Sequence, residues 1–123
     1  MRKFLTNIFS VALLSLAFAA ALPAATPETI DGVTRIHLEQ HNGYFAARET
    51  LAGLEPGTYE FVVTNSAGKL VGFQLTDADG ENLDMFPLEP GETRTSRVEI
   101  TGEGFRYRCP INPTPWYEVS VSP

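Results

Sequence analysis

Apolar and polar residues alternate through most of the chain after residue 33, as expected of strands that bury one face. The alternation predicts strands at residues 34–40, 58–65, 71–76, 93–101, 105–109 and 117–121. Turn residues separate these segments, including Glu55-Pro56-Gly57 and the Asp79-Gly80 pair. Short strands at this spacing predict one all-β domain, an antiparallel Greek-key β-sandwich over residues 34–123.

The inward-facing positions of these strands give a predicted core. Its members are Phe61, Phe73, Val98, Phe105, Tyr107 and Val119. Only residues 44–51 depart from the strand pattern, because Ala46 and Ala47 permit a helical turn or two there. Residues 26–33 are expected to form an N-terminal extension ahead of the domain.

The first 25 residues have the organisation of a secretory signal peptide. Arg2 and Lys3 form a basic start, residues 8–21 carry no charge, and small residues such as Ala25 supply a cleavage region. The apolar run is shorter than the ~20 residues of a membrane anchor. We therefore predict export to the periplasm or the exterior, with no membrane anchor after cleavage.

Charge and cysteine content limit the function of the remaining residues. Losing Arg2 and Lys3 from the nine basic residues leaves seven against fifteen acidic ones, a formal charge of −8. Such a surface repels nucleic acid and anionic lipid. One cysteine, Cys109, cannot form an intramolecular disulfide, so it is buried, metal-bound or paired with another chain.

Cys109 stands at the end of the alternating segment 105–109, and prolines at 110, 113 and 115 then interrupt regular structure. This arrangement resembles the copper-loop end of a cupredoxin. Segments 54–57, 62–65, 72–75 and 88–93 follow the order of that family as well. The chain is most similar to the non-blue cupredoxin domains of periplasmic iron-uptake proteins of the EfeO type, which carry a strand like Tyr107-Arg108-Cys109.

The resemblance implies copper or iron as a cofactor, with Cys109 as a ligand. A type 1 blue copper centre needs two His and one Cys with a weak axial ligand. The loop after Cys109 contains neither His nor Met, and residues 70–73, where the family places its first His, contain no ligand. We therefore expect an atypical or degenerate site in which Met85, His41 and Glu39 assist Cys109. The alternative is an inert buried thiol and no cofactor.

His37, Glu39 and His41 occupy alternate positions of one predicted strand and share a face. Neighbours in this row lie about 6.6 Å apart, so either adjacent pair is able to chelate a metal, whereas the two His are about 13 Å apart. A solvent-facing polar strand gives the same pattern.

Trp116 and Tyr117 follow the last proline of the segment 110–117. They either form an exposed aromatic patch for a partner or fill the pocket that copper would occupy. Met85 also has two interpretations: its sulfur is a soft ligand for a metal, or its side chain is an apolar cap on the sandwich. The acidic residues between Asp77 and Asp84 are expected to form a solvated turn, because the spacing of an EF-hand is missing.

Two functions remain open. The first is an exported cupredoxin-like accessory in copper or iron handling. The second is a metal-free sandwich that binds another periplasmic or secreted protein through the loop from Pro110 to Tyr117. The sequence contains no recognisable nucleophile–base or paired-carboxylate constellation, so we predict that the protein is not an enzyme.

Overall fold

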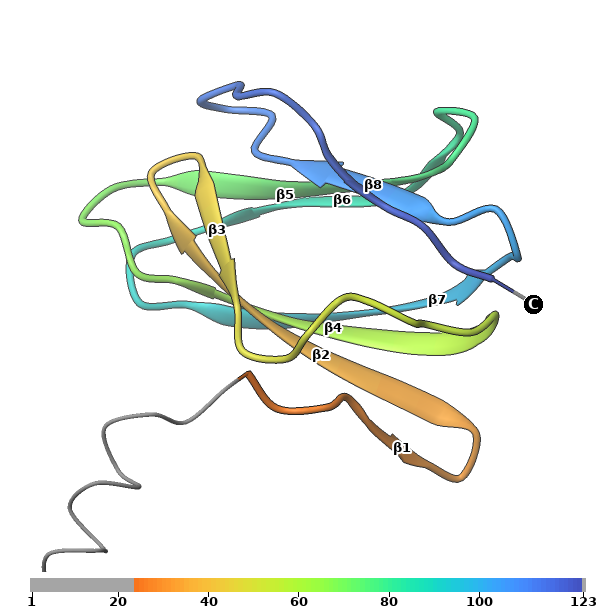
Figure 1. Cartoon of the computed structure of the whole chain (residues 1–123). Coiled ribbons are helices and arrows are strands. Elements are labelled where there is room, and N and C mark those ends of the chain that lie inside the picture. The colour runs from red at the N-terminus through yellow and green to blue at the C-terminus, as the bar shows by residue number, and fades with distance from the viewer. Residues whose placement is uncertain (1–23, 123) are drawn as a thin grey trace, which may run out of the picture.

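The computed structural model describes residues 24–122, so the predicted signal peptide falls almost entirely outside the described residues. Nine strands stack as two layers (Figure 1). They are β1 (Glu28–Ile30), β2 (Val33–His41), β3 (Tyr44–Ala47), β4 (Gly57–Asn65), β5 (Val71–Asp77), β6 (Asn82–Leu88), β7 (Thr93–Ile100), β8 (Phe105–Arg108) and β9 (Tyr117–Val119). Within residues 24–122 there is no helix long and apolar enough to cross a membrane.

The two layers confirm the predicted all-β sandwich. The first sheet has the order β1-β2-β4-β7, with β3 also paired to β2, and the second has the order β6-β5-β8-β9. Strands β2 and β4 run parallel, with Ile36 opposite Phe61, whereas the other registered strand pairs are antiparallel. The first sheet is therefore mixed.

The structure corrects the expectation for residues 44–51, because β3 is a strand and not a helical turn. Asn42 and Gly43 both have positive φ angles, 55° and 102°, and join β2 to β3 as a two-residue hairpin. Asn-Gly is the preferred pair for such a turn, since both central residues need positive φ. The hairpin overrides the helical propensity of Ala46 and Ala47.

Two further strands were not expected from the alternation. β1 lies within residues 26–33 and pairs with the start of β2 through a second two-residue turn, Asp31-Gly32, with φ angles of 53° and 78°. β6 contains Pro87 and is an edge strand of the second sheet, a position that tolerates a missing backbone donor.

Aromatic side chains fill the space between the sheets. Phe61 from the first sheet lies 5.2 Å from Phe105 and 6.2 Å from Phe73 of the second, measured between ring centroids. Of the predicted core, Phe61, Phe73, Phe105 and Tyr107 are buried, whereas Val98 and Val119 are partly buried and pack against the cluster. The inward faces of β4, β5 and β8 are therefore those that the alternation predicted.

Candidate functional site

Cys109 follows β8 directly and continues its alternation into the sandwich. Its side chain is 0% exposed and belongs to the core cluster. Pro110 then presses against β5, where a Cβ on Gly72 would lie 3.1 Å from the proline ring. The absence of a side chain at Gly72 lets the chain beyond the cysteine approach this strand closely.

Backbone amides surround the Cys109 sulfur. The N–H of Asn112 donates a hydrogen bond to Sγ over 3.3 Å. Burial raises the pKa of the Cys109 thiol. Hydrogen bonds from the amides of Asn112, Gly72 and Ile111 and from the Gln40 side chain lower it by a larger amount, so the pKa lies below its ordinary value. Hydrogen bonds to a thiolate favour the charged form. The site is thus buried like a core thiol, yet its hydrogen bonds stabilise the thiolate.

Gln40 connects the cysteine environment to two other parts of the chain. Its side chain is 0% exposed, donates from Nε2 to the Gly72 carbonyl at 2.9 Å and accepts from the Gly43 N–H at 2.6 Å. Both ends of the amide are therefore satisfied, as a buried polar group requires. This residue fixes β2, the β2–β3 turn and β5 around Cys109.

Residues 110–116, here named the proline loop, dock on the β2–β3 turn. Asn112 Nδ2 donates to the Asn42 carbonyl at 2.7 Å, and Thr114 Oγ1 donates to the Gly43 carbonyl at 2.8 Å. A Cβ on Gly43 would lie 2.9 Å from the Asn112 carbonyl oxygen, so the approach needs glycine. These hydrogen bonds position the proline loop, which has no strand pairing of its own.

Apolar side chains are exposed around this docked loop. Ile111 is 48% exposed on the loop, Tyr44 is 64% exposed beside the β2–β3 turn, and Leu70 is 43% exposed just before β5. These are three of the five large apolar residues exposed in the described chain, the other two being Ile30 and Met85. The proline loop, Tyr44 and Leu70 thus form one surface, named here the loop-end surface.

Met85, one predicted partner of Cys109, lies on the opposite face of its sheet. It is opposite Gln74 of β5, which in turn is opposite Arg108, and it is 55% exposed. Cys109 points between the sheets, whereas the row containing Met85 points outward. The two sulfur atoms therefore do not share a site.

Glu39 and His41 face outward from β2, with side chains 54% and 50% exposed. His41 Nε2 lies 3.9 Å from Glu39 Oε2, so the structure brings this predicted pair together. The buried neighbour between them, Gln40, is the residue that faces Cys109. Alternation along β2 thus separates the pair from the thiol.

His37 is bound to Glu49, a residue that no sequence pattern singles out. His37 Nδ1 lies 2.6 Å from Glu49 Oε2, and the His37 N–H donates to Glu49 Oε1 at 2.7 Å. Glu49 is 7% exposed and closes the edge of β2 where its partner changes from β1 to β3. These two hydrogen bonds give His37 a structural role at this edge of the sheet.

The residues present do not fit a single copper or iron centre built on the predicted set. Cys109, Met85 and the Glu39–His41 pair lie on three different faces of the sandwich, as the strand registers above require. Among residues 24–122, no three His, Cys, Asp or Glu side chains lie close enough together to hold a metal ion. A metal bound by Cys109 would need donors outside this set.

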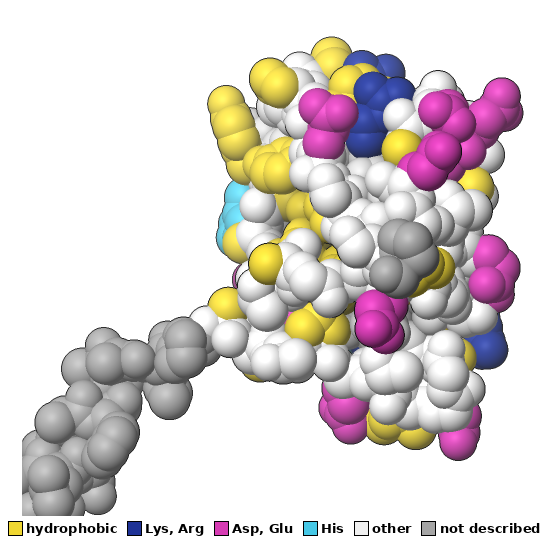
Figure 2. Space-filling model, turned by 45° about the vertical axis from the view of Figure 1, so that its right-hand side comes forward, with side chains coloured by type: hydrophobic (Ala, Val, Ile, Leu, Met, Phe, Trp, Pro, Cys, Tyr) yellow, Lys and Arg dark blue, Asp and Glu magenta, His cyan; other side chains and the backbone are white. Residues whose placement is uncertain are grey.

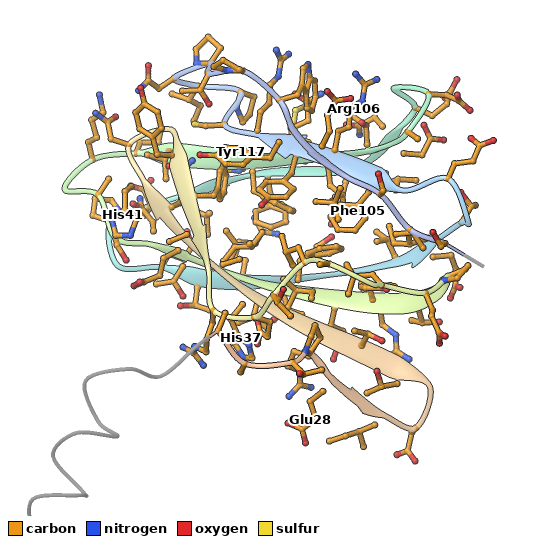
Figure 3. All side chains as sticks on the ribbon, in the orientation of Figure 1. Glu28, His37, His41, Phe105, Arg106 and Tyr117 are labelled. Carbon is orange, nitrogen blue, oxygen red and sulfur yellow. The ribbon has the colours of Figure 1, made fainter. Side chains whose placement is uncertain are left out.

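Trp116 and Tyr117 are adjacent in sequence but lie on opposite faces. Tyr117 begins β9, stacks on Tyr107 with ring centroids 5.0 Å apart, and its hydroxyl accepts the Phe45 N–H at 3.1 Å. Trp116 lies outside, where Arg108 Cζ is 4.3 Å from its ring centroid. In Figure 3, Arg106 lies on the outer side of the upper sheet. Of the two residues, only Trp116 lies on an outer face.

The polar residues that organise the site do not stand out in the sequence. Gln40 and Glu49 belong to no sequence motif. They act through hydrogen bonds to residues that are distant in sequence. The Asn42-Gly43 pair was a usable signal, because it predicts a hairpin and hence the turn on which the proline loop docks.

The fold defines the chain as an all-β sandwich protein with a buried cysteine at one end. In comparisons with known proteins, no family model matches the sequence. No curated protein matches it either.

Proposed function

We propose that this protein is exported and acts by binding another protein through its loop-end surface, without an enzymatic step. The observation that carries the proposal is the docked proline loop, which presents Ile111 while Asn112 and Thr114 fix the backbone behind it. A loop already held in its bound conformation loses little conformational entropy on association, so more of the contact energy is kept as affinity.

The composition of this surface supports a protein partner. Tyr44, Leu70 and Ile111 combine exposed apolar and aromatic area, and the surrounding backbone is rich in proline. Clustered exposed apolar residues mark interaction sites when polar residues surround them. In Figure 1, the segment between β8 and β9 stands out beyond the upper sheet.

Site-specific photo-crosslinking in the native cells tests this proposal. A photoreactive phenylalanine analogue at Ile111 or Tyr44 should give the same discrete crosslinked product. The analogue at Ile30, which is 58% exposed on β1 away from this surface, is the matched control and should give none. Excess wild-type protein should compete, whereas the Ile111→Asp, Tyr44→Asp double variant should not. Equal crosslinking at Ile30, or no product at Ile111 and Tyr44, would contradict the proposal.

Copper or iron handling is the second candidate function, in line with the cupredoxin resemblance. The amide hydrogen bonds that lower the pKa of Cys109 support it, because the thiolate is the form that binds metals. The test is whether Cu(I) or Fe(II) raises the melting temperature of the mature protein and whether Cys109→Ala abolishes the rise. A rise that survives in Cys109→Ala would place the metal elsewhere.

A further inference from the structure

Arg108 is held in a fixed position on the outer face of the second sheet. Its guanidinium carbon lies 4.3 Å from the Trp116 ring centroid, and its Nε donates to Gln74 Oε1 at 3.2 Å. Stacking on the indole and the bond to Gln74 together orient the planar group. The terminal N–H groups remain for a ligand, since Nε is the one that Gln74 occupies.

Arg106 lies on the same face, two residues earlier on β8. Its guanidinium carbon is 5.5 Å from the Trp116 ring centroid, and its Nε is buried without a hydrogen-bond partner. A Cβ on Gly80 would lie 3.0 Å from its terminal nitrogen, so the turn between β5 and β6 confines the group. Two cations therefore share one indole.

These cations lack an ion pair within the described chain. The pairs formed there involve Arg35 with Glu60, His37 with Glu49 and His41 with Glu39. Glu118 is opposite Arg106 in the register and offsets part of its charge, whereas Arg108 is followed across the sheet by Gln74 and Met85, which are uncharged. Arg108 is thus a cation with no acidic residue in its cross-strand row, on a protein whose formal charge without residues 1–25 is −8.

We propose that Arg108, assisted by Arg106 and Trp116, binds the carboxylates of an acidic segment in the partner protein. The proposal rests on the proposed function and names the chemistry of the partner. A guanidinium whose plane is fixed by stacking presents paired donors that match a carboxylate. Figure 2 shows basic side chains beside apolar ones at the top of the molecule, with acidic side chains on both sides.

A protein segment fits this surface better than a small free anion. Trp116 is the last residue of the proline loop, so the cations lie beside the loop-end surface and one partner is able to contact both. Met85, 55% exposed in the same cross-strand row as Arg108, offers an apolar contact that an inorganic anion does not use. Charges farther than about 8 Å from Arg108 are largely screened at physiological ionic strength, so the side chains close to it determine its attraction for an anion.

Titration of the mature protein with a hexaglutamate peptide tests the proposal. Trp116 is the only tryptophan in the chain, so its fluorescence reports binding at this position. We expect a saturable fluorescence change, with the dissociation constant measured in parallel by calorimetry. Arg108→Gln should weaken binding at least tenfold, and Arg108→Lys should weaken it less, because the charge is kept but the planar donor pair is lost.

Arg48→Gln is the matched control, since Arg48 is exposed just after β3, at the edge of the other sheet, and forms no ion pair in the described chain. It should bind hexaglutamate as the wild type does. Circular dichroism checks that each variant is folded. No saturable change with hexaglutamate, or an equal loss in Arg48→Gln and Arg108→Gln, would overturn the proposal. Inorganic phosphate binding as tightly as hexaglutamate would overturn it too, by assigning the site to small anions.

The crosslinked product from Ile111 separates this proposal from the proposed function. If Arg108→Gln leaves that product unchanged and hexaglutamate does not bind, the carboxylate site is wrong while the loop-end surface stands. If no product forms at Ile111 but hexaglutamate binds Arg108, the proposed function is wrong and the carboxylate-binding chemistry remains.

Discussion

The backbone N–H of Asn112 donates to the sulfur of Cys109 over 3.3 Å, and the side chain of the same asparagine binds the Asn42 carbonyl at 2.7 Å. One residue therefore connects the buried thiol to the turn that supports the exposed proline loop. The state of the thiol and the conformation of the loop are coupled through this residue, which makes Cys109 a probe of the whole site.

Cys109 should react slowly with a thiol-labelling reagent in the native protein and quickly after denaturation. Its side chain is fully buried, so access limits the reaction even though the amides lower its pKa. Mass spectrometry of the labelled fraction over time measures the two rates. Rapid native labelling would mean that the proline loop opens readily.

The lowered pKa of Cys109 also predicts a pH dependence of stability. Because the folded state favours the thiolate, the stabilisation is complete above the ordinary thiol pKa of 9.0 and is lost as pH falls through the lower folded pKa. The free energy of unfolding of the wild type, relative to Cys109→Ser, should therefore be larger at pH 9 than at neutral pH. Urea denaturation at both pH values measures the difference, and a constant difference would contradict the prediction.

Adding Cu(II) to the purified protein should give no intense blue thiolate absorption. Two His and one Cys cannot converge, since His41 faces outward, His37 is bound to Glu49 and Cys109 is enclosed. Visible absorption spectroscopy is the measurement. An intense band that disappears in Cys109→Ser would refute our interpretation of the donor set.

Phe105→Ala should lower the free energy of unfolding by about 3–5 kcal/mol. Phe105 is 1% exposed and lies against Phe61 from the opposite sheet, so truncation leaves a cavity at the centre of a small core. Ile30→Ala, at a residue that is 58% exposed, is the control and should change stability by less than about 0.5 kcal/mol. A loss below about 1 kcal/mol for Phe105→Ala would be inconsistent with this core.

The raised pKa of Tyr107 predicts that the protein loses stability at alkaline pH. Burial, with a smaller contribution from Tyr117, raises the pKa of Tyr107 from 10.0 to about 12. The neutral phenol is thus favoured by folding, so its contribution is complete below pH 10 and lost as pH rises toward 12. Two pKa units correspond to roughly 2.7 kcal/mol. Tyr107→Phe should remove this slope, and the exposed Tyr44→Phe should retain it. Equal alkaline slopes in wild type and Tyr107→Phe would disprove the assignment.

The local pattern of the sequence predicted much of the fold. Alternation in residues 58–65, 71–76 and 105–109 gave the strands β4, β5 and β8 and their buried aromatic residues, because a strand with one buried face must repeat every two residues. The same period placed Arg106 and Arg108 outward and Tyr107 inward. Two turns, Asp31-Gly32 and Asn42-Gly43, were also readable and would have located β1 and β3.

The site was decided by tertiary structure. Sequence proximity grouped Trp116 with Tyr117, and residue type grouped Cys109 with Met85, but the sheet registers place each pair on opposite faces. The parallel pairing of β2 with β4 is nonlocal in the same way, since no local pattern specifies which strand becomes a neighbour. Gln40 binds Gly72 across 32 positions in sequence, and Asn112 binds Asn42 across 70. Alternation fixes which face of a strand is buried, whereas the packing of distant strands determines which side chains meet there.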